Sequence, residues 1–447
     1  MRGALVAAAL AACGPQVDDP HASDTESDPT TSTGTNPTDP TAPSATNPTS
    51  PTGPTDPSDT NGDTTGEPPT GTVAAVDILL VVDNSGSMGE EQARLAASIG
   101  SLVAGLDAAG ADYRVGITTT DNGNPWCNGT GPEGGRLVAT SCRSRTQDFV
   151  FAGAQMVDAT QEACLDVCPE EWANIAISPT STAGDPQARP RPWIESIGGA
   201  TNLPPGLSVT QALQCMVPQG INGCGFEEHL ESMYKAIVRS ETDGEESQGF
   251  HRPGVPLMVL MFTDEADCSL NKAHETIFLP DGDRTFWSDP TTGAPTSAVC
   301  WNAGVECLGG MCSSIDLDPQ GNPVPSDLAD DDASLRPVSR YLARLDEVEA
   351  NDQALNPGSR VFFALIAGVG SDGTPVYQQG IDPQFELDFG IGPGCESPTT
   401  RAVPPVRNFE LSNQFRIGDD RNTFSICDDD LGPALESLTA TVASTFP

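Results

Sequence analysis

Unbroken apolar runs, each followed by polar residues, recur along this chain. They cover residues 78–82, 256–262 and 361–367, and a fourth apolar stretch covers 113–117. Short apolar runs without alternation are typical of strands that are buried on both faces of a parallel sheet. We therefore expect four central strands, the first of which extends over residues 73–82.

Between these runs, apolar residues recur at the spacing of a helix. Residues 90–109 place five of them on one face: Leu95, Ile99, Leu102, Val103 and Leu106. The same spacing predicts helices at 208–216, 229–239, 338–348 and 428–444, the last with the aspartates of 428–430 as its N-terminal cap. Alternating strands and helices predict an α/β fold. We expect a doubly wound, mostly parallel central sheet with helices on both faces.

The first 72 residues differ in composition from the rest. Residues 1–13 are interpreted as a bacterial lipoprotein signal peptide, with Arg2 before an apolar stretch and Cys13 as the lipidated residue. An ordinary export signal is the alternative. Residues 14–72 are rich in Thr, Pro, Asp and Ser and contain no Lys or Arg. Such a segment cannot bury enough apolar surface to offset its ordering entropy, so we expect a disordered linker.

Residues 73–447 are expected to form one domain with two Cys-rich insertions, at about 121–205 and 268–336. We expect the first insertion to have a small core of its own, built on Trp126, Trp172 and Trp193.

Charge excludes several functions. The chain has 21 basic and 63 acidic residues and a net charge of −42. It lacks the basic patches of a nucleic-acid binder, and charge would not draw it to anionic lipid. No apolar run is long enough for a transmembrane helix. We expect membrane attachment only through a lipid on Cys13, in the cell envelope. Outer-membrane anchoring is the default, and the domain faces either the periplasm or the cell surface.

The cysteines predict disulfides. Thirteen are present, and lipidation of Cys13 leaves an even set, as is usual for exported proteins. Zinc is disfavoured because the chain has four His and no paired CxxC spacing. We expect six disulfides among Cys127, Cys142, Cys164, Cys168, Cys215, Cys224, Cys268, Cys300, Cys307, Cys312, Cys395 and Cys427. Plausible local pairs are Cys127–Cys142, Cys164–Cys168, Cys215–Cys224 and Cys395–Cys427.

Oxygen-bearing side chains follow two of the expected strands. Asp83, Ser85 and Ser87 come directly after the first, and Asp264 comes after the run at 256–262. The carboxyl ends of parallel strands share one edge of a sheet, where open α/β folds bind their ligands. Carboxylates and hydroxyls are hard ligands, so a divalent cation (Mg²⁺, Mn²⁺ or Ca²⁺) is the expected cofactor.

This pattern resembles the metal-ion-dependent adhesion site of the von Willebrand factor A domain. With the signal peptide, the linker and the stretch Thr-Asp-Glu-Ala-Asp-Cys at 263–268, the chain resembles the von Willebrand A-type lipoproteins of myxobacteria. The resemblance implies a Rossmann-like fold with a divalent cation held by Asp83, Ser85, Ser87 and Asp264. It also implies a protein partner whose acidic side chain completes the metal's coordination.

The sequence departs from the family in the second loop, where the family has a Thr. Here the loop at 222–228 has none, and Thr201 precedes the wrong helix. Glu227 is the candidate replacement ligand, with Glu228 as the alternative. The other interpretation of Glu227 is a helix cap.

Two functional hypotheses remain. The favoured one is a non-enzymatic surface lipoprotein that binds a protein partner through its metal site. The alternative is a disulfide-stabilised structural envelope protein with a degenerate site, as the missing Thr suggests. An enzyme is not expected, because the sequence has no nucleophile elbow, phosphate loop or H-E-x-x-H motif. A partial EF-hand pattern at 316–327 contains three prolines and is not favoured as a calcium site.

Overall fold

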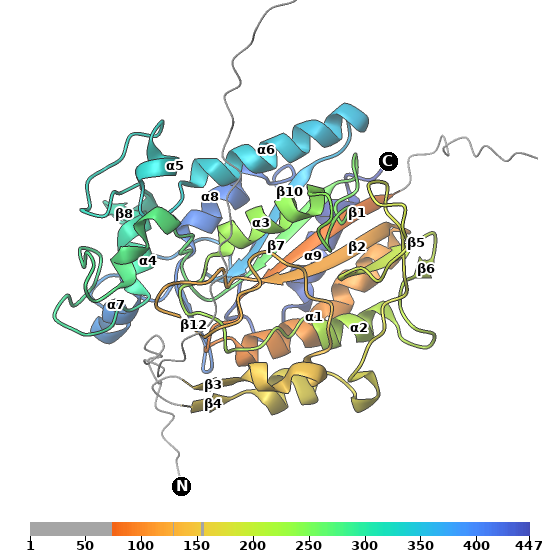
Figure 1. Cartoon of the computed structure of the whole chain (residues 1–447), viewed down its shortest axis with the longest axis horizontal. Helices are drawn as coiled ribbons and strands as arrows, with labels where there is room; N and C mark the ends of the chain where they lie inside the picture. The colour runs from red at the N-terminus through yellow and green to blue at the C-terminus, as the bar shows by residue number, and fades with distance from the viewer. Residues whose placement is uncertain (1–73, 128, 153–155) are drawn as a thin grey trace, which may run out of the picture. The chain divides into compact units, whose positions relative to one another are not determined.

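The computed structural model describes residues 74–447, except 128 and 153–155. A seven-stranded sheet with the order β13-β10-β7-β1-β2-β5-β6 runs through its centre (Figure 1). The five strands from β13 to β2 pair in parallel, and β5 and β6 add an antiparallel edge. The bounds are β1 (Ala75–Val82), β2 (Asp112–Thr119), β5 (Trp193–Ile197), β6 (Ala200–Thr201), β7 (Leu257–Phe262), β10 (Val361–Ala367) and β13 (Thr423–Ser425).

Helices cover both faces of this sheet, as Figure 1 shows. One face carries α1 (Gly89–Ala108), α2 (Val209–Met216) and α9 (Gly432–Ala443). The other carries α3 (His229–Glu241), α6 (Val338–Leu355) and α8 (Val406–Gln414).

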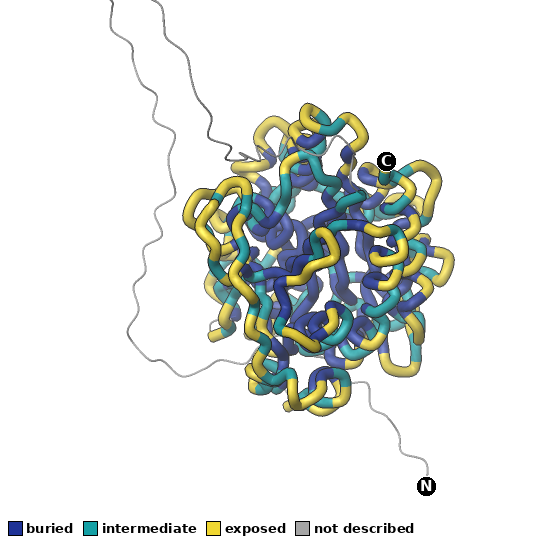
Figure 2. Tube along the Cα trace, turned by 90° about the vertical axis from the view of Figure 1, so that its right-hand side faces the viewer, coloured by how far each residue is buried: buried dark blue, intermediate teal, exposed yellow. Residues whose placement is uncertain are grey.

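Successive residues of β1 supply the two cores alternately. Ile78 and Leu80 pack under α1, whereas Leu79 and Val81 pack under α3. All four are at most 1% exposed, and Figure 2 shows the buried interior in dark blue. Burial on both faces explains the unbroken apolar runs, and the predicted doubly wound fold is confirmed.

The segment 121–205 contains two kinds of structure. Its first part forms the short helical turns η1 (Cys142–Phe149), η2 (Gln161–Leu165) and η3 (Glu170–Trp172) and the hairpin strands β3 (Val150–Ala152) and β4 (Met156–Asp158). Its end returns to the central sheet as β5 and β6.

The expected tryptophan core of this segment is wrong. Trp193 lies in β5 and packs into the main core, Trp126 joins the cluster of the second insertion, and Trp172 borders the clusters around α1 and η1. The small core of the first insertion is built instead on Phe149, Phe151 and the disulfides around them.

The second insertion contains η4 (Lys272–Phe278), α4 (Ala298–Gly304), β8 (Val305–Leu308), β9 (Met311–Ser314) and α5 (Ala329–Asp332). Its cluster is built on Phe278, Trp287 and Val299, against which Phe226 also packs. After β10 the chain forms α7 (Pro383–Phe389) and the short strands β11 (Cys395–Glu396) and β12 (Arg401–Ala402).

All twelve cysteines from Cys127 onward form disulfides, so the predicted set of six is confirmed. The pairs are Cys127–Cys224, Cys142–Cys164, Cys168–Cys215, Cys268–Cys300, Cys307–Cys312 and Cys395–Cys427. Of the four pairs expected from proximity in sequence, only the last is correct. Cys127–Cys142, Cys164–Cys168 and Cys215–Cys224 are wrong.

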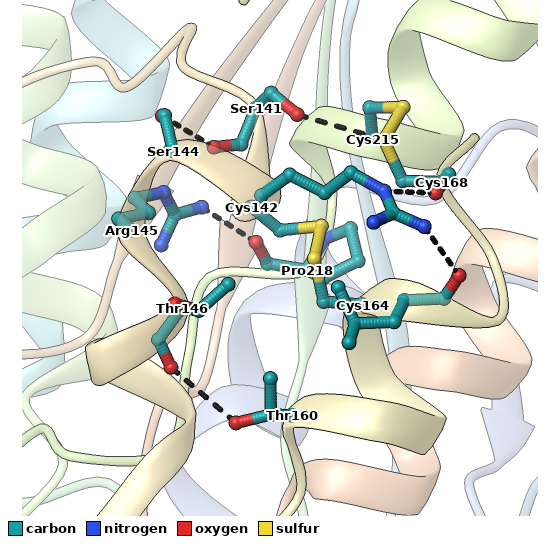
Figure 3. Close-up of a disulfide and its surroundings, with 12 residues drawn as sticks. Ser141, Cys142, Ser144, Arg145, Thr146, Thr160, Cys164, Cys168, Cys215 and Pro218 are labelled. Carbon is teal, nitrogen blue, oxygen red and sulfur yellow. Dashed lines mark hydrogen bonds between the residues drawn. A yellow bond between two sulfur atoms is a disulfide. The ribbon is translucent and has the colours of Figure 1, made fainter. Parts of the chain in front are cut away.

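The physical reason is that the tertiary packing of the chain determines which cysteines pair. Cys164 and Cys168 stand one helical turn apart, with the backbone N–H of Cys168 donating to the carbonyl of Cys164 at 2.9 Å. Each sulfur bonds a cysteine of another segment (Figure 3). The guanidinium of Arg145 adds a hydrogen bond to the carbonyl of Pro218, so that the Cys168–Cys215 disulfide and polar contacts together fasten the first insertion to α2 and to the segment just after it.

The last helix starts later than expected. It begins at Gly432 rather than at 428, and Asp430 accepts a 2.8 Å hydrogen bond from the Gly432 backbone N–H just at its start.

The signal peptide, Cys13 and the linker lie outside the described residues. Among the helices that the structure describes, none has the length and apolar character needed to cross a membrane.

Candidate functional site

The site begins with Asp83, which directly follows β1 and is fully buried. Its backbone N–H donates to the carbonyl of Phe262 at 2.9 Å, which continues the pairing of β1 with β7. One carboxylate oxygen accepts the backbone N–H of Ser85 at 2.8 Å, and the other accepts the Thr263 hydroxyl at 2.6 Å. Asp83 therefore joins the loop after β1 to the loop after β7.

Ser85, Ser87 and Asp264 meet beside it. The hydroxyl oxygens of the two serines lie 3.1 Å apart, and Ser87 donates to a carboxylate oxygen of Asp264 at 3.3 Å. Neighbouring parallel strands bring these residues together from positions 177 apart in sequence. The structure thus gathers the four predicted side chains of the two loops at the carboxyl edge of the sheet.

The chemistry and spacing of these oxygens fit a divalent cation. An octahedral Mg²⁺ has ligands at about 2.1 Å, which puts adjacent oxygens about 3.0 Å apart, and Ca²⁺ requires slightly more. The measured spacings of 3.1 and 3.3 Å agree with both. Among the described residues, no group of three or more His, Cys, Asp or Glu side chains could hold a metal ion. The candidate set instead mixes carboxylates with serine hydroxyls.

Glu227 does not cap α3, so that interpretation is wrong. The residue at the helix N-cap is Glu228, whose side chain makes no capping bond. The first free N–H groups of the helix donate instead to Asp267 and Ser269, from the segment after β7.

Glu227 is fully buried, and one of its carboxylate oxygens accepts the Thr120 hydroxyl. The other carboxylate oxygen has no hydrogen-bond partner among the described residues. No hydrogen bond in the described part of the chain joins Glu227 to the four convergent side chains. Thr201 is exposed in edge strand β6.

Negative charge accumulates at this edge of the sheet. Burial raises the pKa of Asp264 and of Glu265 well above the usual range, and the charge of Asp83 raises each further. Burial also raises the pKa of Glu227 well above its usual range, and the charges of Asp83 and Glu265 raise it further. Within the described residues, no Lys or Arg forms an ion pair with the carboxylates of Asp83, Asp264, Glu265 or Glu227. The nearest basic group is His229, 3.7 Å from Asp83. A cation would supply the missing countercharge.

Gln92 on α1 joins the start of the loop after β1 to the segment at Gly220, and this role was not predicted from the sequence. Its amide nitrogen donates to the backbone carbonyls of Asp83 and Gly220 at 2.8 and 2.7 Å, and its amide oxygen accepts the N–H of Gln219 at 2.8 Å. Gln92 is fully buried. The available signal was a polar residue three positions before Leu95, on the apolar face of the predicted helix.

A cleft of about 640 Å³ opens over the convergent oxygens. Ser85, Ser87 and Asp264 lie in its floor, together with Glu91 and Glu265. Its walls come from separate parts of the chain: Phe151 and Val157 from the first insertion, Ser297 from the second, and Phe385 and Phe389 from α7. A ligand at the floor would therefore be surrounded by both insertions.

No protein-family model and no curated protein sequence matches the chain. Among solved structures, the pilus adhesin SpaC from Lactobacillus rhamnosus GG in its open conformation aligns with a TM-score of 0.35 and 10% identity, over 84% of this chain and 30% of that one. A second crystal form gives 0.32 and 11%, over 84% and 31%. The chain thus spans less than a third of that adhesin's length.

Proposed function

We propose that this chain is a non-enzymatic binding module of the von Willebrand factor A type, which holds a protein partner through a divalent cation. The observation that carries the proposal is the convergence of Ser85, Ser87 and Asp264 in the lining of an open cleft, beside the buried carboxylate of Asp83. The cation would be Mg²⁺, Mn²⁺ or Ca²⁺, and its chemistry is that of a Lewis acid with room for a ligand from outside the chain.

The residues of the chain have distinct parts in this proposal. Ser85, Ser87 and Asp264 offer oxygens toward the cleft, while Asp83 is held by Ser85 and Thr263 and contributes its charge. An acidic side chain of the partner would complete the coordination. The role of Glu227 as a replacement for the missing Thr stays a proposal, supported by its buried, unpartnered oxygen.

The proposal extends to the location of the chain. Six disulfides are typical of proteins that fold in an oxidising compartment. Lipidation of Cys13 and a linker of residues 14–72 would hold the module at the outer membrane. We expect the partner to meet it there, at the surface or in the periplasm.

A second candidate is a structural envelope protein whose site binds no metal. One observation favours it: both carboxylate oxygens of Asp83 already accept hydrogen bonds from within the chain, and the serines bond each other and Asp264. In that case the cluster would only stabilise the two loops.

A capture experiment separates the two. The full chain, immobilised on beads, is offered envelope proteins with Mg²⁺, with chelator, and with Mg²⁺ restored. A variant with Ser85→Ala and Ser87→Ala is compared with a control that replaces the half-buried Ser98 and Ser101 of α1, which lie outside the cleft, by Ala. We expect reversible, Mg²⁺-dependent capture by the wild type and the control alone. Equal capture by the Ser85/Ser87 variant, or no effect of chelator, would reject the binding module.

A further inference from the structure

The rim of the cleft is acidic, although the proposed partner offers an acidic group. Glu90 and Glu162 are exposed there, and Asp382 and Asp388 are half-buried. They come from the start of α1, from η2 and from the α7 segment, so three separate parts of the chain supply the same charge. A purely acidic ligand would have to pass this rim before it reached the floor.

Arg401 is the one basic residue among the described residues that line the cleft, and it is already engaged. Its guanidinium lies 2.6 Å from a carboxylate oxygen of Asp382 and 3.6 Å from one of Glu396. It also stacks over the ring of Phe385, with 4.5 Å to the centroid. Two carboxylates therefore neutralise the positive charge of Arg401, and Arg94, behind the lining residues Glu91 and Thr400, is likewise paired with Glu91 at 3.2 Å.

A buried carboxylate oxygen at the floor is left without a partner. Glu91 lines the cleft and is 1% exposed. Its first oxygen accepts the hydroxyl of Thr400 and a hydrogen bond of 3.2 Å from Arg94. Its second oxygen has no hydrogen-bond partner in the described part of the chain. An unsatisfied buried carboxylate oxygen is costly, and a donor from a ligand would satisfy it.

The lining of the cleft also contains large apolar side chains. Phe151 and Val157 come from the first insertion, and Phe385 and Phe389, whose ring centroids lie 4.4 Å apart, come from α7. Lys and Arg are suited to such a surrounding, because their long aliphatic stems pack on apolar surface while their charged ends reach carboxylates.

We propose that the cleft selects a basic segment of its protein partner: an acidic residue for the cation at the floor, flanked by Lys or Arg side chains that reach the rim carboxylates and Glu91. This rests on the proposed metal-dependent binding function and adds the chemical class of the ligand to it. The volume of about 640 Å³ suits a short peptide segment rather than a flat protein surface.

Three labelled peptides test the inference by fluorescence anisotropy on the full chain with Mg²⁺. They are Gly-Lys-Leu-Asp-Leu-Lys-Gly, the same peptide with both Lys replaced by Glu, and the first with Asp replaced by Ala. At about 0.05 M salt, where exposed charges are weakly screened, we expect the Lys-flanked Asp peptide to bind about tenfold more tightly than the Glu-flanked one.

Two double variants test whether the preference for the Lys-flanked peptide arises from the rim carboxylates. Glu162→Gln with Asp388→Asn should weaken the Lys-flanked peptide about threefold to tenfold, since each exposed ion pair contributes modestly. Glu171→Gln with Asp327→Asn makes the same change of net charge at exposed carboxylates outside the cleft, and should leave binding unchanged.

The outcomes separate this inference from the proposed function. Equal affinity for the Lys- and Glu-flanked peptides, no binding of the Lys-flanked one, or equal loss in the rim variant and its control would overturn the basic preference. If the Lys-flanked peptides bind equally well with Asp or Ala and with chelator present, the basic preference stands and the metal-dependent function fails.

Discussion

Replacing His251 by Gln should remove a large, pH-dependent part of the stability of this chain. His251 is mostly buried before β7, at the end of the sheet opposite the cleft. Its Nε2 lies 2.8 Å from a carboxylate oxygen of Asp352 on α6, and its Nδ1 lies at an ion-pair distance of 3.5 Å from Asp77 on β1. Arg252 also pairs with Asp77, at 2.8 Å. The imidazolium therefore joins a helix and a loop to the central strand.

The magnitude follows from the pKa of the imidazole. Burial lowers the pKa of His251, but the hydrogen bond to Asp352 and the charge of Asp77 outweigh burial and raise it to about 9. An exposed histidine has a pKa of about 6.5, so folding favours uptake of the proton. A difference of about 2.5 pKa units corresponds to about 3 kcal/mol, present in full below pH of about 6.5 and lost as the pH rises through about 9.

Urea unfolding of the wild type and of His251→Gln, at several pH values, measures this contribution. The wild type should exceed the variant by about 3 kcal/mol at pH of about 6, by about 2 at pH of about 7.5 and by almost nothing at pH of about 9.5. Peptide and metal binding should survive in the variant, because the cleft lies at the other edge of the sheet. A stability difference that stays constant across this range would refute the reasoning.

Three further perturbations have defined outcomes. Replacing Cys395 and Cys427 by Ser opens a disulfide with a sequence separation of 32 and should lower the free energy of unfolding by about 3–4 kcal/mol in urea. Gly116→Ala places a Cβ 2.8 Å from the ring of Phe250, so thermal denaturation should show a loss of about 1–3 kcal/mol, and an unchanged Tm would contradict the packing. Gln92→Ala removes buried hydrogen bonds to Asp83, Gln219 and Gly220 and should cost about 2–4 kcal/mol in urea unfolding. The same variant should bind Mn²⁺ more weakly, and unaltered Mn²⁺ affinity would show that the loop needs no such support.

The central strands were predictable because their burial is extreme. Each of β1, β7 and β10 is covered on both faces, so nearly every position is apolar, and the exception, Asp77 near the start of β1, is paired with His251 and Arg252. β5 and β6 were missed because an edge pair needs no such run, and β5 begins with a Trp that also suited an insertion core. The antiparallel pairing of β5 with β2 depends on the path of the whole segment, so the local sequence contains little signal for it.

The convergence of the two loops was predictable for a related reason. Once 78–82 and 257–262 are accepted as parallel neighbours, Asp83 and Asp264 must follow at the same edge. The second loop was harder, because Glu227 accepts a hydrogen bond from Thr120, just after β2, and the helix that follows it is capped by Asp267 from a third segment. Contacts of this kind are set by tertiary packing, as are the disulfide partners in the first insertion.

The central claim is that Asp264 and the serines of the first loop hold a divalent cation. Titration of Mn²⁺ into the full chain, followed by electron paramagnetic resonance, tests it most directly. We predict one tight site in the wild type, and an affinity at least about tenfold weaker in Asp264→Asn with an unchanged near-ultraviolet circular dichroism spectrum. Equal Mn²⁺ binding by the wild type and by a correctly folded Asp264→Asn would contradict the claim.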